Sequence, residues 1–577
     1  MPIHNADIAQ LFEEMADLLE IGDANPFRVR AYRNAARLVG ELQLDIAAAL
    51  AKGEALPKLP GIGADLDGKI REIVATGHLA ALERLRKTMP PAITELLHIP
   101  GLGPKRVKML YHELDVQTVP QLYKAAREGR IRDVPGFGEK TETHILEATE
   151  AHLSKARRFK LAVGAQYADA IVAYLRAVPG VRDCLAAGSV RRMRETVGDI
   201  DILVTAAPGS PVAQRFVAYP EVKEVLASGA SRSSVVLQSG LQVDLRVVPP
   251  DSYGAALQYF TGSKAHSIAL RRLAQERGLK LNAYGVFRGA TRIAGDTEAS
   301  VYAALGLPWI PPELREDRGE IDAALQGKLP RLVELGDLRG DLHAHTKWTD
   351  GHDTVRAMAK AALAHGLSYL AITDHSRRLT FAHGLDPDRL REQGAEIRKA
   401  GAGLAGITLL TGIEVDILDD GMLDLPDRVL AELDVVIAAV HSKFGLTRER
   451  QTERILRALD NPCVALLAHP LGRLIGEREP YDVDMLKIIR KAKARGIFLE
   501  LNAHPERLDL FDTHCRMARD EGVLVSVNSD AHSVLDFDNL KYGIGQARRG
   551  WLEKGDVLNT RGVGEVRRLL RRPPGFR

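Results

Sequence analysis

The spacing of apolar residues changes twice along the chain. Up to about residue 155 apolar positions recur with helical spacing, and from Lys160 onward aliphatic runs such as DIDILVT (199–205) and LQVDLRVV (241–248) alternate with helical segments. Residues 305–336 are rich in proline and charge, which is typical of a linker. Beyond them, seven short aliphatic runs separated by helical segments predict a β/α barrel.

A near-repeat occurs three times in the first 140 residues. The copies are LPGIGADLDGK from Leu59, IPGLGPKRVK from Ile99 and VPGFGEKTE from Val134. Each places two glycines in a tight turn ahead of a helix, whose first backbone N–H groups can meet a phosphate. This pattern predicts three helix-hairpin-helix motifs that bind a DNA backbone without reading its sequence. The predicted DNA contacts are Gly61, Gly63, Gly101, Gly103, Lys105, Gly136 and Gly138.

Length and composition indicate several folded domains. A chain of 577 residues exceeds the roughly 250 to 300 residues that one core supports, and 45% hydrophobic residues suffice for buried cores. Cys184, Cys463 and Cys515 are too widely spaced for a disulfide framework, which favours a reducing compartment. The N-terminus lacks the features of a signal peptide, and no apolar run is long enough to span a membrane. We therefore expect a cytoplasmic protein without a membrane partner.

Charge is distributed unevenly. The net charge is only +3, but residues 151–315 contain 21 Lys and Arg against 13 Asp and Glu, a local excess of 21 − 13 = +8. Such an excess suits a polyanionic partner, although a mixed solvated surface is the alternative interpretation.

Three aspartates form the first candidate site. Asp199 and Asp201 alternate along an apolar strand, so both side chains point to one face, and Asp244 interrupts another apolar strand. A single strand aspartate usually marks an edge or a turn. Three inward carboxylates, however, would repel one another unless cations were bound. With the neighbouring GSVRR (188–192), whose turn and arginines suit a triphosphate, they predict a site for two divalent cations and a nucleotide.

These motifs resemble those of the family X, polymerase beta-like, DNA polymerases. GSVRR, GDIDILV (198–204) and YFTGS (259–263) carry the resemblance. It implies that Asp199 and Asp201 hold Mg²⁺ and that Asp244 joins them and accepts the primer 3′-hydroxyl proton. The implied nucleotide contacts are Gly188, Ser189, Arg192, Tyr259, Phe260 and Gly262. Gln242 and Ser267 replace the Arg and Asn of animal members, which puts minor-groove contact and fidelity in doubt.

The resemblance extends into the N-terminal region. NPFRVRAYR (25–33) and residues 59–70 are similar to the small N-terminal domain of the family, and Lys69 falls at its lyase lysine. A Schiff-base lysine needs a depressed pKa. A solvated helix lysine that touches phosphate is the alternative, and the sequence favours it.

The second candidate site lies in the barrel. His343 and His345 are expected on a strand with their imidazoles facing the same way, and Asp350 follows in a loop. Further N and O ligands lie at or just beyond strand ends, where barrel active sites form. They are His375, Glu414, His441, His469, Asp530 and His532. No thiolate is among them, so the set suits Zn²⁺, Mn²⁺ or Fe²⁺.

The motifs DLHAHT, ITDHS, GIEVD, VHS, AHP and SDAH resemble the PHP (polymerase and histidinol phosphatase) domain from Leu338 onward. TDG (349–351) stands where SDG is usual and keeps the aspartate. The resemblance implies up to three ions, Mn²⁺ or Zn²⁺, and phosphoester hydrolysis. The implied ligand sets are His343, His345, Glu414 and Asp530; Glu414, His441 and His469; and Asp350, His375 and His532.

Together these patterns predict a multidomain protein. We expect α-helical helix-hairpin-helix domains over 1–90 and 91–155, an α+β nucleotidyltransferase palm over 156–252, a thumb over 253–315, a linker over 316–337, and a distorted (β/α)7 barrel over 338–577. The expected function is that of a monomeric repair polymerase that uses deoxynucleoside triphosphates to fill gaps in gapped or nicked DNA, as in base excision repair. The resemblance to bacterial family X polymerases with a PHP domain implies that the barrel supplies 3′-5′ exonuclease, AP-endonuclease or 3′-phosphatase activity.

Two alternatives remain open. The barrel could be a small-molecule phosphatase, like histidinol phosphatase, that accompanies the polymerase, or the protein could be a non-catalytic scaffold for DNA ends.

Overall fold

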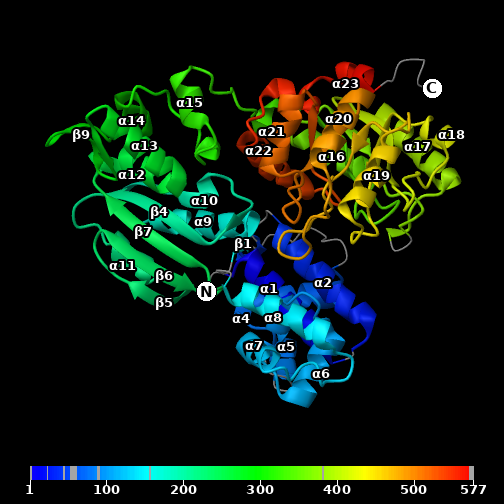
Figure 1. The fold of residues 1–577 in the computed structure, drawn as a ribbon, viewed down its shortest axis with the longest axis horizontal. Helices are drawn as coiled ribbons and strands as arrows, with labels where there is room; N and C mark the ends of the chain where they lie inside the picture. The colour runs from blue at the N-terminus through cyan, green and yellow to red at the C-terminus, as the bar shows by residue number, and fades with distance from the viewer. Residues whose placement is uncertain are drawn as a thin grey trace. The chain divides into compact units, whose positions relative to one another are not determined.

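The chain folds into two compact units. The computed structural model describes residues 3–22, 24–42, 46–51, 62–86, 91–154, 158–379 and 382–570. The first unit comprises Met1–Phe159, Ala218–Val225 and Val235–Gln242, and the second comprises Lys160–Val217, Leu226–Ser234 and Val243–Arg577 (Figure 1). None of the helices within these described ranges is long and apolar enough to cross a membrane.

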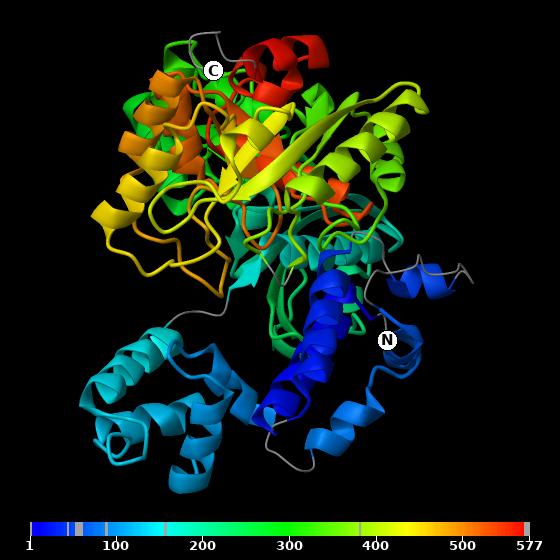
Figure 2. The same cartoon turned by 90° about the vertical axis from the view of Figure 1, so that its right-hand side faces the viewer.

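The described part of the chain up to Ser154 contains helices but no strand (Figure 2, blue to cyan). Apolar residues three or four apart give α1 a buried stripe, formed by Ile8, Phe12 and Met15. The ring of Phe12 meets Tyr32 of α2 edge to face, with ring centroids 5.7 Å apart. The helices are α1 (Asn5–Ile21), α2 (Pro26–Glu41), α3 (Ile46–Ala51), α4 (Ala64–Thr76), α5 (Ala80–Arg86), η1 (Pro91–His98), α6 (Pro104–Leu114), α7 (Val119–Arg127) and α8 (Glu139–Ser154).

A helix follows each of the three hairpin motifs, as predicted. The N-caps of α4 and α6 are Gly63 and Gly103, and α8 begins directly after Gly138. Gly101 and Gly136, the first glycines of the second and third motifs, have φ of 88° and 82°, a left-handed conformation that favours glycine. The first glycine of the first motif, Gly61, lies outside the described residues.

A five-stranded sheet in the order β2-β4-β7-β6-β5 occupies the region expected to be the palm. Helices α9 and α12 (Tyr253–Thr261) pack against β4, whose alternate residues Ile200 and Ile202 are fully buried. The strands are β2 (Val181–Ala186), β4 (Asp199–Ala206), β5 (Val222–Ala227), β6 (Arg232–Leu237) and β7 (Gln242–Val248); a short pair joins β1 (Phe159–Lys160) and β3 (Thr196–Val197); the helices are α9 (Leu161–Arg176), α10 (Gly188–Arg191) and α11 (Val212–Val217).

The thumb region follows, and the segment expected to be a linker is folded. Within 316–337, helix α15 forms, and Leu332 joins a buried apolar cluster that also contains Trp551. The elements are η2 (Pro250–Ser252), α12 (Tyr253–Thr261), α13 (Lys264–Glu276), β8 (Lys280–Asn282), β9 (Gly285–Arg288), β10 (Thr291–Ala294), α14 (Glu298–Ala304), η3 (Pro312–Leu314), α15 (Glu320–Leu325) and η4 (Leu335–Asp337).

The remaining chain forms the predicted barrel, with seven parallel strands in sequence order and helices outside them (Figure 1). The strands are buried on both faces, as parallel strands require: Leu370 and Ile372 join a large cluster that includes helix residues, whereas Tyr369 and Ala371 join a second cluster. A bridge between Ala344 and Ala531 nearly closes the barrel. The strands are β11 (Gly340–Asp341), β12 (Tyr369–Ile372), β13 (Thr408–Asp416), β14 (Val435–Ala439), β15 (Leu466–Leu467), β16 (Phe498–Asn502) and β17 (Val525–Asn528); the helices are α16 (Val355–Ala364), α17 (Pro387–Ala402), α18 (Asp427–Leu430), α19 (Arg448–Ala458), α20 (Met485–Arg495), α21 (Asp512–Glu521), η6 (Asp536–Asn539), α22 (Leu540–Arg549), η7 (Lys554–Asp556), η8 (Leu558–Thr560) and α23 (Val563–Leu570).

Candidate active sites

Three carboxylates converge on the palm sheet. Asp199 and Asp201 lie on β4, and Asp244 lies on the adjacent strand β7. Burial raises the pKa of Asp201 to about 7, and the charges of Asp199 and Asp244 add to the rise. Asp244 is itself buried, and its Oδ1 accepts a hydrogen bond from the Ser234 hydroxyl of β6. Burial and the neighbouring charges together disfavour the ionised form of Asp201, and a divalent cation would offset both, so the three residues fit a metal site.

A tight turn brings the backbone against these carboxylates. Gly188 has φ of 60°, and a Cβ on it would lie 2.5 Å from Asp201 Oδ2. Only glycine therefore allows this approach. The hydroxyl of the next residue, Ser189, is buried and makes no hydrogen bond within the described chain. An orphaned buried donor beside a carboxylate cluster suits a phosphate ligand.

The predicted nucleotide-binding segment lies beside this turn. Arg192 Nη1 donates to the Thr261 carbonyl at 2.7 Å, and its Nε donates to Glu316 at 3.0 Å. The rings of Tyr259 and Phe260 meet edge to face, with centroids 5.1 Å apart. The structure thus brings the GSVRR and YFTGS motifs together.

Close packing explains the glycine of YFTGS. The two residues that differ from animal members of the family, Gln242 and Ser267, lie on β7 and α13. A Cβ on Gly262 would lie 2.8 Å from the His266 ring. Gln242 begins β7, and Ser267 is buried on α13.

The nine barrel residues gather at the carboxyl ends of the strands, with one correction to the expected positions. Strand β11 ends at Asp341, so His343 and His345 lie beyond the strand rather than on it. The Ala344 bridge to Ala531 continues the ladder between them and keeps both rings in the site, with centroids 5.1 Å apart.

Three subsets of the nine residues are each close enough to hold one ion. They are His343, His345 and Asp530; His375, Glu414 and His441; and His345, Asp350, His375 and His532. His469, which was expected beside Glu414, has its Nε2 2.8 Å from Glu414 Oε1. The subsets share members, so the residues fit a compact multi-ion centre.

Several buried polar atoms of this centre have no hydrogen-bond partner among the described residues, and a metal ion would supply one. The Nε2 atoms of His343 and His345 lie 3.4 and 3.1 Å from Asp530 Oδ1. Both nitrogens are buried and have no hydrogen bond to any described residue. Glu414 Oε2 is also buried without one. Buried polar atoms of this kind need a partner, and imidazole nitrogens and carboxylate oxygens are the donors that Zn²⁺ and Mn²⁺ accept.

Acids and an amide outside the cluster contact the predicted metal ligands. Glu500 Oε1 lies 2.7 Å from His343 Nδ1, and Asp416 Oδ1 lies 3.0 Å from His441 Nδ1. The amide of Asn502 donates to Asp530 at 2.9 Å. These contacts turn the other ring nitrogen of each histidine toward the centre. Sequence reasoning missed all three residues, although the polar pair LELN (499–502) within an aliphatic run was a visible signal.

Two of the predicted metal ligands have an unusual backbone conformation. His469 and Asp530 have φ of 25° and 55°. Left-handed conformations at residues other than glycine are uncommon and concentrate at functional sites. This feature has no signature in the sequence.

The predicted DNA-contacting residues form exposed hairpins. Gly63, Gly101, Gly103 and Lys105 are exposed, whereas the apolar Leu102 between two glycines is buried. Gly136 and Gly138 are likewise exposed around the buried Phe137. In each of these two hairpins one apolar side chain is buried, and the glycine backbone on either side of it is exposed and can contact a DNA backbone.

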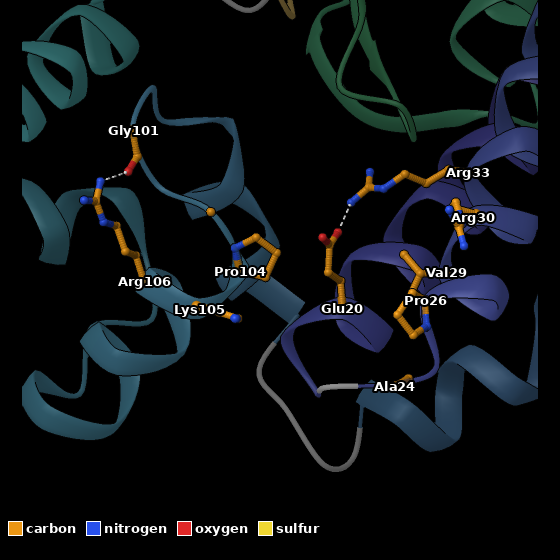
Figure 3. A pocket seen from close by; sticks show the side chains of 11 residues that line it. Glu20, Ala24, Pro26, Val29, Arg30, Arg33, Gly101, Pro104, Lys105 and Arg106 are labelled. Atoms are coloured by element: carbon orange, nitrogen blue, oxygen red, sulfur yellow. Dashed lines mark hydrogen bonds and ion pairs between the residues drawn. The ribbon is translucent and has the colours of Figure 1, made fainter. Parts of the chain in front are cut away.

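A basic pocket of about 800 Å³ lies in the first unit beside the second hairpin (Figure 3). It is bounded by Gly101, Gly103, Pro104, Lys105 and Arg106 on one side and by Glu20, Ala24, Pro26, Val29, Arg30 and Arg33 on the other. Arg106 donates to the Gly101 carbonyl at 2.8 Å, and Arg33 donates to Glu20 at 2.7 Å. Four cationic side chains against one acid suit a phosphate-bearing ligand.

Lys69 on α4 is engaged by an acid. Its ammonium group pairs with Asp65, one turn earlier, and lies 5.7 Å from the centroid of the Tyr32 ring. Burial lowers the pKa of Lys69, but the hydrogen bonds to Asp65 and Tyr32 outweigh burial and raise it overall. The structure therefore does not supply the depressed pKa that a Schiff-base lysine needs.

Comparison with protein families gives four matches. The matching models are described as a helix-hairpin-helix domain (residues 3–79), a SAM-like helix-hairpin-helix tandem (93–151), a DNA polymerase beta thumb (256–316) and a PHP domain (341–504).

Known proteins align with the whole chain and with parts of it. The DNA polymerase/3′-5′ exonuclease PolX of Bacillus subtilis is 38% identical over 577 residues, covering 99% of this chain and 100% of that protein. Rat DNA polymerase lambda is 28% identical over 291 residues, covering 45% of this chain and 48% of that protein. A probable phosphatase of Thermoanaerobacter sp. is 30% identical over 243 residues, covering 40% of this chain and 94% of that protein.

Proposed function

The chain belongs to the family X DNA polymerases that carry a C-terminal PHP domain, and we propose that it fills short gaps in DNA and trims 3′ ends. The convergence of Asp199, Asp201 and Asp244 beside Ser189 and Arg192 is the observation that carries the proposal. A scaffold that only bound DNA ends would have no need of three mutually repelling carboxylates.

In the palm, the three aspartates would hold Mg²⁺. Two divalent cations at this site would neutralise the charge of the reacting phosphates. Ser189 and Arg192 bind the terminal phosphates, and Tyr259 and Phe260 line the sugar pocket. Asp244 accepts the proton of the primer 3′-hydroxyl directly, or its negative charge assists the removal of that proton.

In the barrel, the nine ligands would hold Mn²⁺ or Zn²⁺. Such ions polarise a phosphoester and supply a nucleophile near neutral pH. Glu500 and Asp416 hold His343 and His441 in the ligating orientation, and Asn502 fixes Asp530. The substrate of this site is the 3′ end of a DNA strand, with AP-endonuclease or 3′-phosphatase activity as related outcomes of the same chemistry.

The proposed partners are gapped or nicked duplex DNA and deoxynucleoside triphosphates, bound by a monomer. The exposed hairpin glycines and the basic pocket beside Gly101 support contact with the DNA backbone. Cys184, Cys463 and Cys515 form no disulfide, which is compatible with a cytoplasmic location.

One alternative has a specific observation in its favour. The Thermoanaerobacter relative named a probable phosphatase aligns with this chain over 94% of its own length. A barrel of this type can therefore exist without a polymerase, and its substrate could be a small phosphoester.

The test uses the full chain with three substrates. A duplex with a one-nucleotide gap measures extension, a labelled duplex with a mispaired 3′ end measures degradation, and histidinol phosphate measures small-molecule hydrolysis. We expect extension with Mg²⁺, degradation with Mn²⁺, and little hydrolysis of histidinol phosphate. The variant Asp199→Ala, Asp201→Ala should lose extension and keep degradation, whereas Asp183→Asn, on the same sheet but outside the cluster, should keep both. Extension that persists without Asp199 and Asp201 would overturn the palm assignment.

A further inference from the structure

The segment between the thumb and the barrel supports the nucleotide-binding motifs. The backbone N–H of Ser263, the last residue of YFTGS, donates to the Arg315 carbonyl at 3.0 Å. Glu320 is fully buried and hydrogen-bonded to the ring of His266. Glu316 accepts a hydrogen bond from Arg192, the predicted triphosphate ligand. The segment is therefore part of the wall behind the nucleotide site.

The same segment is bonded to the barrel domain. Glu316 Oε1 accepts a second hydrogen bond, at 2.9 Å, from Nη1 of Arg549 at the end of α22. The same Nη1 donates to the Arg192 carbonyl at 2.9 Å, and Arg549 Nη2 donates to Asp512 of α21 at 2.7 Å. The Arg549 side chain is only 2% exposed. It thus reaches both the backbone of Arg192 and the acid that holds the Arg192 side chain.

Helix α22 approaches the Arg192 loop closely. A Cβ on Gly545 would lie 3.0 Å from Met193 Cβ, so the helix and the loop are in tight contact at this point. Glu195, two residues further along the loop, accepts a hydrogen bond from Arg473 at 2.8 Å. The loop that contains Arg192, the residue predicted to bind the triphosphate, is therefore packed against the barrel over several residues.

The charges at this contact compete with one another. Glu316 Oε1 is shared by Arg192 at 3.0 Å and Arg549 at 2.9 Å, with Arg194 at 3.9 Å. If Arg549 were removed, the carboxylate would be left mainly to Arg192. A more exclusive ion pair would hold the Arg192 guanidinium more tightly and make it less available to a phosphate.

We infer that Arg549, a residue of the barrel domain, is a positioning residue for nucleotide binding in the palm: by sharing Glu316 it keeps the Arg192 guanidinium available to the triphosphate. The inference rests on the proposed polymerase function. It also makes the barrel a structural part of the nucleotide site, independently of the barrel's own hydrolytic chemistry.

Steady-state gap filling on the full chain tests this role. Arg549→Ala should raise the KM for the deoxynucleoside triphosphate about tenfold and leave kcat nearly unchanged. A tenfold change in affinity is what the loss of one charge-assisted hydrogen bond typically causes. Arg549→Lys keeps the charge and should restore much of the loss. Arg549→Ala combined with Glu316→Gln should bring KM back toward the wild-type value, because the competing carboxylate is gone.

The matched control is Arg548→Ala. Arg548 is the preceding residue of α22, and it pairs with Glu313 at 2.7 Å and with the Val333 carbonyl at 3.1 Å. Its removal should leave KM unchanged. Degradation of a mispaired 3′ end, which depends on the barrel, reports whether Arg549→Ala still folds.

Three outcomes separate the possibilities. A wild-type chain that does not extend a primer refutes the proposed function. A wild-type chain that extends, with an unchanged KM in Arg549→Ala, refutes the positioning role. A double variant that is worse than Arg549→Ala refutes the competition for Arg192 and assigns Arg549 a merely structural part.

Discussion

Replacing Asp201 by asparagine should stabilise the metal-free palm while abolishing polymerisation. Asp201 is crowded by Asp199 and Asp244, and burial together with these charges raises its pKa from 3.8 to about 7. A raised carboxyl pKa means that the ionised form is disfavoured in the folded state. The penalty is absent below about pH 3.8, grows as the pH rises, and is complete above about pH 7.

The size of the effect follows from the pKa. A rise from 3.8 to about 7 corresponds to about 4 kcal/mol of lost stability at pH 8. Solvent at the edge of the cluster and relaxation of the side chains reduce this value, so we expect a gain of about 1 to 4 kcal/mol in Asp201→Asn. The gain should shrink between pH 8 and pH 5, and Mg²⁺ should stabilise the wild type but not the variant.

Hydrogen exchange of peptides covering β4 measures this locally, which avoids treating a multidomain chain as two-state. Wild type and Asp201→Asn are compared with EDTA and with Mg²⁺ at both pH values. Asp183→Asn, whose carboxylate accepts a hydrogen bond from Thr205 at 2.6 Å on the same sheet, is the control and should show no dependence on Mg²⁺. Equal protection of wild type and Asp201→Asn in EDTA at pH 8 would show that burial and the neighbouring carboxylates do not penalise ionised Asp201, and would refute the reasoning.

Three further changes test other parts of the molecule. Glu500→Gln should lower the bound Mn²⁺ or Zn²⁺ and the exonuclease rate by about 10- to 100-fold, as removal of an orienting partner typically does, and metal content unchanged after dialysis would contradict the orienting role. Asp65→Asn should lower the pKa of Lys69 and increase borohydride trapping of a 5′-deoxyribose phosphate end, whereas trapping equal to that of the wild type would show that the ion pair does not limit reactivity. Burial raises the pKa of Glu298, but its paired arginines outweigh burial and lower it to about 2, so its stabilisation is present above pH 4.5 and is lost toward pH 2. Glu298→Gln should therefore destabilise the thumb by about 3 kcal/mol at pH 7 and by less at pH 3. Fluorescence of Trp309, whose indole donates to Glu298 at 3.1 Å, follows this unfolding, and an equal loss at both pH values would refute the assignment.

The sequence was sufficient to predict the barrel because histidines and acids follow its aliphatic runs. Each aliphatic run of the barrel ends close to a histidine or an acid, so the prediction of the strands and the prediction of the metal centre reinforce each other. The exact end of β11 was not predictable, because GDLHAH alternates like a strand up to His345, whereas strand length depends on which neighbours are available for pairing. Glu500 and Asn502 were missed because their role depends on the side chains they face, His343 and Asp530, which only the assembled barrel brings to them.

Long-range partners account for the remaining differences. Proline and charge made 316–337 resemble a linker, and nothing local in the sequence reveals that Glu316 meets Arg549 more than two hundred residues later. The pair of Lys69 with Asp65 is different, because a spacing of four residues on a helix predicts it directly.

The packing of Leu332 with Trp551 has a practical consequence for dividing the gene. Val333 donates a backbone hydrogen bond to the Leu552 carbonyl at 3.0 Å, and Arg331 donates one to Glu553 at 2.8 Å. A cut at Leu338, where family resemblance begins, would strip these residues from the remaining barrel and expose Trp551. Severed halves should therefore aggregate more readily than the intact chain, and a barrel exchanged between relatives should carry residues 316–337 along.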